Sequence, residues 1–482
     1  MFRRILIALF VLIAAGVAWF AAASSGYPDA LQPRRERPSM VRIDHARLIP
    51  MVAGADRVQE DHSVLMIDGV IDRVGPTRTF TNPPGVSETD MLVIDAAGRT
   101  LLPGLIDAHV HVWDEAELAA YLAHGVTSVR NMSGLPFHLS LIARIKEGRL
   151  LGPDISTTGP ILNSPGPNQQ PNHQLVTTAA EARAAVAEQY EAGYRTLKVY
   201  SNLEREPYEA ILEEVDRLGL AITGHTPEGR RGPGVPFDAP FDISFQESLD
   251  DNFVSIEHVE SVVWHGLSGR LDEAAMQVLA KQIAASQTVV TATLIAQDNL
   301  VRVAESDGAY LHRAGVETIN PVIRWLESET YAFWSAQDPA AGEGPRAEFY
   351  RLATAILHRE GVTIIAGTDA GIFTNIPGSS LTRELELLVK SGLTPYEALA
   401  AATSLAAPVI GFPDRGQVAP GFAANLVLVD GDPLSDISVM EKPEGVSVRG
   451  VWLDDEDLNE LRRASRQTSL ARTARHIAPV FL

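Results

Sequence analysis

The sequence has no cysteine among its 482 residues. Disulfide bonds, thiolate zinc sites and a cysteine nucleophile are therefore excluded, as is a lipid anchor on a lipobox cysteine. Basic residues are also scarce, because 40 Lys and Arg stand against 61 Asp and Glu, for a net charge of -21. Nucleic-acid binding needs concentrated Lys and Arg, so this balance predicts no nucleic-acid partner. Any metal ion must be held by histidine, carboxylate or modified lysine.

A long hydrophobic run lies at the start of the chain, where two arginines precede the uninterrupted apolar residues 5–23. About 20 apolar residues suit a membrane helix, whereas the three alanines at 21–23 resemble a signal-peptidase site. Positive charge before the run directs the remainder out of the cytoplasm. We predict a signal peptide or, slightly favoured, a membrane anchor over 1–24, followed by a linker over 25–38. The expected location is periplasmic or extracytoplasmic, tethered by a single N-terminal transmembrane helix.

Short β-type runs flank the middle of the chain. VLMIDGVIDRVG, with a predicted turn at Asp68-Gly69, belongs to the N-terminal segment, and ANLVLVD belongs to the C-terminal one. We expect these segments, 39–102 and 396–455, to build one small β-sandwich domain together. Residues 456–482 begin acidic and then become basic, which predicts a C-terminal helix and tail packed on the main domain.

The middle of the chain, 103–395, alternates strand-like apolar runs with helical patterns, as in a parallel β/α barrel. There are eight such runs, the number that closes a (β/α)8 TIM barrel. The expected strands are LIDAHVHV, VTSVRNM, DISTTGP, TLKVYS, AITGHT, SIEHVE, TVVTATL and TIIAGTDAG. The expected helices cover 178–192, 206–218, 273–285 and 346–360. The long connections 227–251 and 297–345 are expected to be lids or specificity elements, or else surface decoration or dimer contacts.

Potential metal ligands stand at the ends of these runs. In a strand ending in IDAHVH, Asp107, His109 and His111 project to one face because side chains alternate. Later runs end in or near Lys198, His225, His258 and Asp369. The carboxyl ends of barrel strands converge on one mouth, so these side chains are expected to meet there. Two imidazoles one pleat apart can hold one metal ion.

These motifs resemble the amidohydrolase superfamily, and within it the imidazolonepropionase-like branch that also contains prolidase-like and Xaa-Arg dipeptidases. The resemblance covers nearly the whole chain after the N-terminal leader. It is carried by PGLIDAHVH (103–111), GVTSVRN (125–131), TLKVY (196–200), GHTP (224–227), SIEHVE (255–260) and GTDAG (367–371). Together these motifs are specific for the superfamily and much less specific for a substrate.

The resemblance implies a dinuclear metal centre. One divalent ion would be bound by His109, His111 and Asp369. A second would be bound by His225 and His258, with N-carboxylated Lys198 bridging the two. Zinc suits these nitrogen and oxygen ligands, with manganese or cobalt as alternatives. The implied reaction is hydrolysis of a C–N amide bond in a dipeptide or N-acyl amino acid by a dinuclear metal-bound hydroxide, with Asp369 as the catalytic acid and base.

The elements that contact substrate in the dipeptidases are different here. Those relatives tend to carry a Gly-Gly-His-Gly element after the third strand and a His-Ala-Tyr-type element after the fifth, where this chain has NSPGPNQQPNHQ and GHTPEGRR. Prolidase specificity therefore cannot be transferred. His173 is either a substrate contact or an exposed loop residue, and Arg130 either binds a substrate carboxylate or forms a buried ion pair. Tyr200 and Arg230 are weaker candidates for the same pocket.

Three other functions stay open. A mononuclear deaminase or cyclic-amide hydrolase like imidazolonepropionase would generally lack the lysine at position 198. A lactonase or phosphotriesterase would use the same dinuclear centre on another bond. A non-catalytic binding protein on an enzyme fold would be expected to have lost a ligand, and none is missing. The expected partner of an enzyme is a small-molecule substrate, and a homo-oligomer is compatible with the sequence.

Overall fold

The computed structural model describes residues 23–33, 38–230, 239–340 and 343–481. The predicted signal peptide or membrane anchor lies outside the described residues, apart from its last two positions. Among the helices that are described, none is long and apolar enough to cross a membrane. The described chain begins beside its last helix, where Arg472 donates a hydrogen bond to the Gly26 carbonyl (3.1 Å).

The two terminal segments share one sheet of eight strands, in the order β18-β17-β16-β5-β1-β2-β3 with β4 paired to β1. The segments meet where β5 and β16 pair antiparallel, with Leu101 opposite Leu428. The predicted β-sandwich is not confirmed, because these strands form a single hydrogen-bonded sheet. Their bounds are β1 (Met40–Leu48), β2 (Gln59–Ile67), β3 (Val70–Pro76), β4 (Leu92–Asp95), β5 (Thr100–Pro103), β16 (Leu426–Val429), β17 (Gly445–Val448) and β18 (Val451–Leu453).

The middle of the chain forms the predicted α/β barrel-type domain. Each of the expected runs contains a strand: β6 (Leu105–Val110), β7 (Val126–Asn131), β8 (Asp154–Thr157), β11 (Thr196–Val199), β12 (Ala221–Gly224), β13 (Ser255–Glu257), β14 (Val290–Thr291) and β15 (Ile364–Ile365). All pairings among them are parallel. Two short strands were not expected, β9 (Ile161–Asn163) and β10 (His173–Leu175).

The barrel strands are not closed into one continuous hydrogen-bonded ladder. They form a three-stranded sheet, β6-β7-β8, and a seven-stranded sheet, β10-β9-β11-β12-β13-β14-β15. A single bridge between Val110 and Ala370 joins the first strand to the segment after the last one. The backbone of Ala108 also donates to the carbonyl of Ala366 (3.0 Å). The end of β6 therefore lies directly against the residues that follow β15.

The helices form where apolar residues recur at helical spacing. In α5, Tyr208, Ile211 and Val215 are buried on one face. The helices are α2 (Ala116–Ala123), α3 (Pro136–Lys146), α4 (Ala179–Ala192), α5 (Arg205–Leu218), α6 (Phe245–Leu249), α7 (Val259–Gly266), α8 (Glu273–Ser286), α9 (Leu294–Glu305), α10 (Pro321–Leu326), α11 (Ser328–Ser335), α12 (Glu343–Arg359), α13 (Ser379–Lys390), α14 (Pro395–Ala401), α15 (Ala406–Val409), α16 (Asp455–Ala464) and α17 (Leu470–Phe481).

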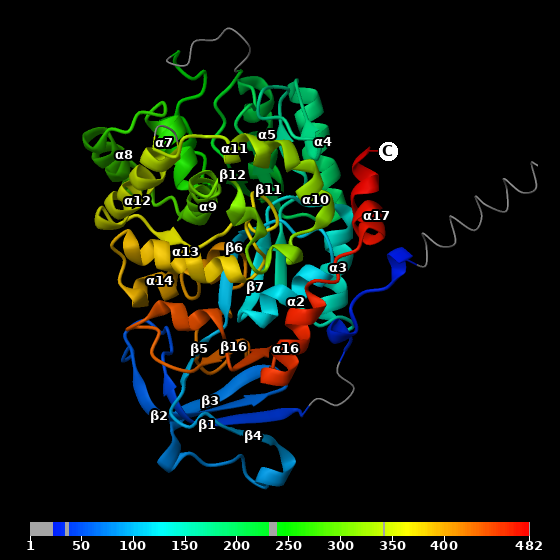
Figure 1. Ribbon diagram of the computed structural model, residues 1–482, viewed down its shortest axis with the longest axis vertical. Coiled ribbons are helices and arrows are strands. Elements are labelled where there is room, and N and C mark those ends of the chain that lie inside the picture. Colours follow the sequence, from blue (N-terminus) through cyan, green and yellow to red (C-terminus); the bar gives the residue numbers. More distant parts are fainter. Residues whose placement is uncertain (1–22, 34–37, 231–238, 341–342, 482) are drawn as a thin grey trace, which may run out of the picture.

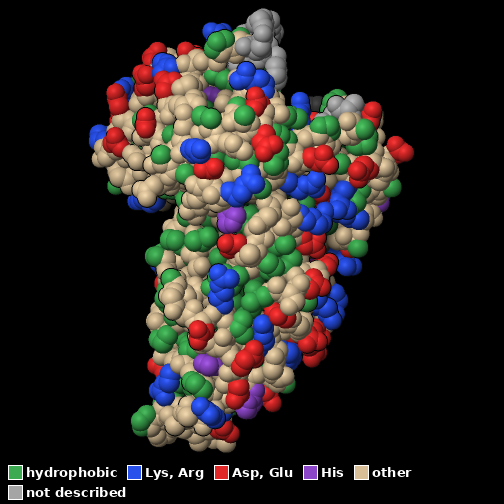
Figure 2. Space-filling view, turned by 90° about the vertical axis from the view of Figure 1, so that its left-hand side faces the viewer, with side chains coloured by type: hydrophobic (Ala, Val, Ile, Leu, Met, Phe, Trp, Pro, Cys, Tyr) green, Lys and Arg blue, Asp and Glu red, His purple; other side chains and the backbone are tan. Residues whose placement is uncertain are grey.

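The terminal sheet and the barrel lie at opposite ends of the molecule, with the sheet at the lower end of Figure 1. The last helices run along the side of the barrel, where α16 contacts α2 and α17 contacts α3 and α10 (Figure 1). On the face in Figure 2, Lys and Arg are interspersed with Asp and Glu and do not gather into a basic patch. The insertion 297–345 is built from helices, including α10 and α11.

Candidate metal centre

Strand ends place three potential ligands at one point of the barrel. His109 and His111 stand at the end of β6 and are buried. Asp369 follows β15 and is also buried. Its Oδ1 lies 3.3 Å from His109 Nε2 and 3.0 Å from His111 Nε2. Among the described residues, these three side chains form the group whose ligand atoms all lie within 4.8 Å of one another.

The other three predicted ligands lie beside this group. Lys198, at the end of β11, is 2% exposed, and its Nζ is 3.4 Å from His109 Nε2. The His258 ring lies 4.5 Å from the His109 ring and 4.7 Å from the His225 ring, measured between centroids. The structure therefore brings together all six side chains that the sequence assigned to the metal centre, as one contiguous cluster.

Each of three histidines is held from behind through its Nδ1. His109 Nδ1 donates to Glu257 Oε2 (2.7 Å). The Nδ1 of His258 is joined to the Thr293 hydroxyl (2.7 Å), and that of His225 to the Ser261 hydroxyl (2.9 Å). A partner on Nδ1 fixes the ring orientation and leaves Nε2 as the ligand atom. This pattern is typical of histidines that bind a metal ion.

Buried atoms without partners test whether a cation fits here. Among the described residues, Asp369 Oδ1 has no hydrogen-bond partner, although it lies close to two imidazole nitrogens. A buried carboxylate oxygen left unpaired is costly, and a divalent cation would satisfy it. Neutral imidazoles and a carboxylate are ligands suited to zinc, manganese or cobalt. The residues present therefore fit a divalent metal ion.

The protonation states of these side chains are those needed to bind a metal cation. Burial lowers the pKa of His109, of His225 and of His258, so all three imidazoles are neutral and can donate a lone pair. Burial also lowers the pKa of Lys198, to about 8. Burial alone would raise the pKa of Asp369, but the neighbouring imidazoles, that of His111 above all, lower it below its ordinary value, so the carboxylate stays ionised.

Backbone conformation around the centre is unusual. His258 and Asp369 both adopt a positive φ, at 69° and 56°. Non-glycine residues rarely do so, and such strain clusters at functional sites. Gly371 is needed at its position, because a Cβ there would lie 2.0 Å from the carbonyl oxygen of His111. The last glycine of GTDAG therefore lets the segment that carries Asp369 approach β6 closely.

The cluster opens into a cavity of about 770 Å³. Five of the predicted ligands line it, together with two of the candidate substrate contacts, His173 and Tyr200. The ring of Tyr200 lies 4.8 Å from the His173 ring and 4.1 Å from the His225 ring, measured between centroids. A substrate in this cavity would therefore meet His173 and Tyr200 directly above the metal ligands.

The two arginine candidates do not line this cavity. Arg130 is 2% exposed and its guanidinium forms an ion pair with Glu257 (2.7 Å), which agrees with the ion-pair alternative and not with substrate binding. The Arg230 side chain is 82% exposed and its nearest ion-pair partner is Glu204, at 3.9 Å.

Several functional side chains were not predicted. Glu257 is fully buried and holds both His109 and Arg130. A carboxylate within an apolar strand, one residue before a ligand, was a signal that could have identified it. Ser261 and Thr293 gave no such signal, because their role depends on which histidine the fold places beside them.

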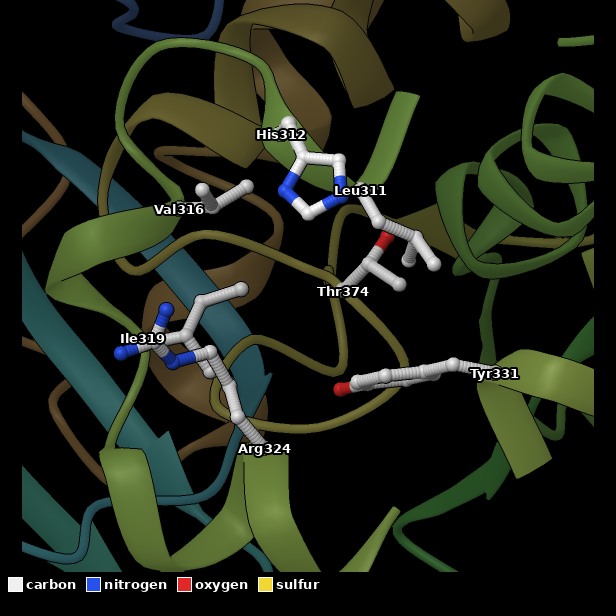
Figure 3. A pocket seen from close by; sticks show the side chains of 7 residues that line it. All are labelled: Leu311, His312, Val316, Ile319, Arg324, Tyr331 and Thr374. Atoms are coloured by element: carbon white, nitrogen blue, oxygen red, sulfur yellow. The ribbon is translucent and has the colours of Figure 1, made fainter. Parts of the chain in front are cut away.

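A second pocket of about 200 Å³ lies within the insertion (Figure 3). It is lined by Leu311, His312, Val316, Ile319, Arg324, Tyr331 and Thr374. One histidine and no carboxylate line it, so it offers no set of metal ligands. Its Tyr331 donates a hydrogen bond to Glu327, which lines the larger cavity. The small pocket therefore lies behind one wall of the candidate site.

Comparison with known proteins gives a consistent result. The profile of the Amidohydrolase family matches residues 100–453. Ochratoxinase from Aspergillus niger is 37% identical over 97 residues, 20% of this chain, and the match spans only 19% of that relative's length. A bottromycin amidohydrolase structure has a TM-score of 0.72 and 25% identity, covering 93% of this chain and 96% of its own. A Xaa-Pro dipeptidase structure has a TM-score of 0.64 and 21% identity, covering 86% and 100%.

Proposed function

This chain belongs to the amidohydrolase family, and on that basis we propose that it is a metal-dependent hydrolase of a C–N amide bond in a small molecule. A dipeptide or N-acyl amino acid is the substrate class that the sequence suggests. The observation that carries the proposal is the buried group of His109, His111 and Asp369 at the base of a large cavity. A binding protein would have no need to keep so costly a cluster of buried polar groups.

The chain offers ligands for two divalent ions. His109, His111 and Asp369 would hold the first, and His225 and His258 the second. Lys198 would link them after its neutral amine adds to carbon dioxide, which forms an N–C bond and releases one proton. The position of Nζ, 3.4 Å from His109 Nε2, would put the new carboxylate among the histidines. When bound, such ions lower the pKa of water from near 16 to about 7 and polarise a carbonyl oxygen.

The side chains of the protein supply proton transfer and orientation. Hydrolysis adds a water oxygen to the carbonyl carbon, breaks the C–N bond and places a proton on the amine nitrogen. We assign this proton to Asp369, whose ionised carboxylate would accept it from water and donate it to the departing amine. Glu257 would keep the His109 ring oriented, because it accepts the Nδ1 hydrogen.

The sequence before residue 25 supports a separate proposal on location. We propose that the chain is exported and held by its N-terminal segment, because two arginines precede a run of apolar residues there. Membrane fractionation of cells that make the full chain tests it, with cleavage at residues 21–23 as the outcome that distinguishes a signal peptide from an anchor.

The metal content of the full chain, prepared with zinc and bicarbonate and measured by plasma mass spectrometry, tests the proposed centre. We expect about two ions per chain and hydrolysis of members of an amide panel. Lys198→Ala should bind fewer ions and lose activity, whereas the exposed Lys281→Ala should do neither. One ion per chain would favour the mononuclear deaminase or cyclic-amide hydrolase. No metal in a folded sample would overturn the proposal.

A further inference from the structure

An exposed apolar patch lies on the insertion and adjoins the cavity. We call it the insertion patch; it consists of Trp325 and Leu326 at the end of α10 and Phe333 in α11. Among the described Trp and Phe side chains, Trp325 and Phe333 are the two that are more than half exposed, at 72% and 56%. Leu326 is exposed as well, and it also lines the cavity. Single apolar side chains on a surface are ordinary, but neighbouring large ones mark a contact site.

The described chain begins on the same side of the barrel. Arg475 of α17 donates a hydrogen bond to the Ser24 carbonyl (3.3 Å). Arg472 of the same helix holds the Gly26 carbonyl, and Leu31 is fully buried. The helix α17 in turn contacts α10 (Figure 1). The first described residues are therefore fixed to α17, and α17 contacts the helix that carries two residues of the insertion patch.

The apolar run of the sequence ends directly before this fixed point. It covers residues 5–23, and Ser24 is already held by α17. No spacer separates the two in the sequence, so a membrane helix formed by the run would end at the surface of the protein. The side of the barrel that carries α17 and α10 would then have to lie at the bilayer.

The chemistry of the insertion patch suits a lipid surface. Tryptophan is enriched at membrane–water interfaces, where its ring meets both headgroups and acyl chains. Arg324 and Arg475 have exposed side chains, and neither forms an ion pair within the described residues, so both can approach lipid phosphates. One exposed carboxylate, Glu329, lies in α11 and opposes this attraction. The apolar side chains, more than the net charge, would therefore carry the contact.

We propose that the insertion patch rests on a lipid bilayer, beside the N-terminal membrane anchor. This inference rests on the proposed location and not on the proposed reaction. Trp325 and Phe333 enter the interfacial layer of the bilayer, and Leu326 places the edge of the cavity at the lipid surface. The cavity is then open to substrates that partition into a bilayer.

The absence of cysteine allows a single probe to be placed at either of two matched positions. Phe333→Cys places it in the insertion patch, and Val278→Cys places it on α8, at a side chain of similar exposure, 60%. The helices α8 and α17 lie on opposite sides of the barrel (Figure 1). Each full-length variant is labelled with a maleimide of the fluorophore nitrobenzoxadiazole. It is then reconstituted into phosphatidylcholine vesicles that contain some phosphatidylglycerol, with or without a nitroxide on the acyl chains.

Quenching by the nitroxide reports contact of the probe with lipid. We expect the nitroxide to reduce emission at position 333 at least about 2-fold and to leave emission at position 278 nearly unchanged. Trp325→Glu, combined with Phe333→Cys, should weaken this quenching because it places a charge in the contact. Trp325 is exposed, so this substitution should leave the fold intact.

Vesicle flotation of the same samples tests the anchor separately. Chains that float but show no quenching at position 333 would overturn docking of the insertion patch and uphold the anchor. Emission at position 333 that shifts to the blue without quenching would show that protein, either a second copy or the N-terminal segment, covers the patch, and would also overturn the inference. Chains that do not float would overturn both proposals. None of these outcomes depends on amide hydrolysis, so the proposed reaction stands or falls separately.

Discussion

The metal centre and the outer cavity, meaning the part of the cavity beyond the metal ligands, form one continuous space but are built differently. In the metal centre, side chains come from strand ends and are supported from behind, as His109 is by Glu257 and His258 by Thr293. In the outer cavity, the walls come from helices and from the insertion, as Leu300 does from α9 and Trp334 from α11. The reaction is therefore tied to the barrel, whereas selectivity depends on elements that can change without disturbing it.

The largest effect on activity is expected from substitution of Asp369, which is both a proposed metal ligand and the residue assigned to proton transfer. Asp369→Asn keeps the shape of the side chain but removes its charge and most of its basicity. We expect kcat to fall about 10^3-fold or more, together with a lower metal content. Asp414→Asn, at a carboxylate that is 57% exposed, is the control and should change neither quantity. Activity within about twofold of wild type would show that Asp369 does not carry the proton.

A smaller effect, a loss of zinc affinity, is expected when the residue that holds the His109 ring is substituted. Glu257→Gln removes the carboxylate that accepts from His109 Nδ1 and from Arg130. Zinc affinity, measured by competition with a chelator, should fall about 10-fold to 100-fold. The surface ion pair of Glu213 with Arg183 provides the control. Glu213→Gln should leave zinc affinity unchanged, and equal effects of both substitutions would contradict a role of Glu257 in orienting His109.

The same contrast explains what the sequence could predict. Strand and helix positions follow from local periodicity, and each of the eight predicted barrel runs contains a strand. The resemblance carried by the motifs, and not the periodicity, predicted the family correctly. Side chains at the carboxyl ends of barrel strands converge regardless of loop conformation. All six predicted ligands accordingly lie in one cluster. The short β9 and β10 were missed because they flank a segment rich in proline, glycine and asparagine, which has no strand periodicity.

Contacts between distant segments could not be predicted. The role of Arg130 depends on Glu257, which another strand brings beside it. Arg230 was one of the weaker candidates for the substrate pocket, and its side chain is exposed. Sequence periodicity indicates where a helix or strand lies and which of its faces is buried, but not which residue of another element contacts it.

Trp113 contacts both the metal centre and the outer cavity, and its substitution should have a moderate effect on kcat/KM. Trp113 lines the cavity, stacks on His111 and donates from its Nε1 to the carbonyl of Gly371 (3.2 Å). Trp113→Phe keeps a ring but leaves that carbonyl unpaired, which costs about 1 to 2 kcal/mol. We expect kcat/KM to fall about 3-fold to 10-fold. Trp325→Phe, at a side chain 72% exposed, should have no effect, and equal values for both variants would contradict the link.

The smallest effect concerns the stability of the fold behind α9, which forms part of the wall of the outer cavity. Glu384 is fully buried and accepts from the backbone of Leu294 (3.0 Å) and of Ile295 (2.7 Å) at the start of α9. Burial raises its pKa to about 8. The unfolded chain ionises this carboxyl near pH 4.5, whereas the folded protein keeps it protonated up to about pH 8. Stability from this group should therefore fall as pH rises through that window.

Glu384→Gln isolates this contribution because glutamine does not titrate. The variant loses one of two acceptors, which should cost about 1 kcal/mol at pH 5. Between pH 5 and pH 8 wild type should lose stability relative to the variant, so the gap between their urea midpoints should close or reverse. Parallel midpoints across this range would show that Glu384 is ionised in the folded protein. Its charge would then be stabilised by the positive end of the α9 dipole, and the outer wall would be supported from behind as firmly as the metal centre.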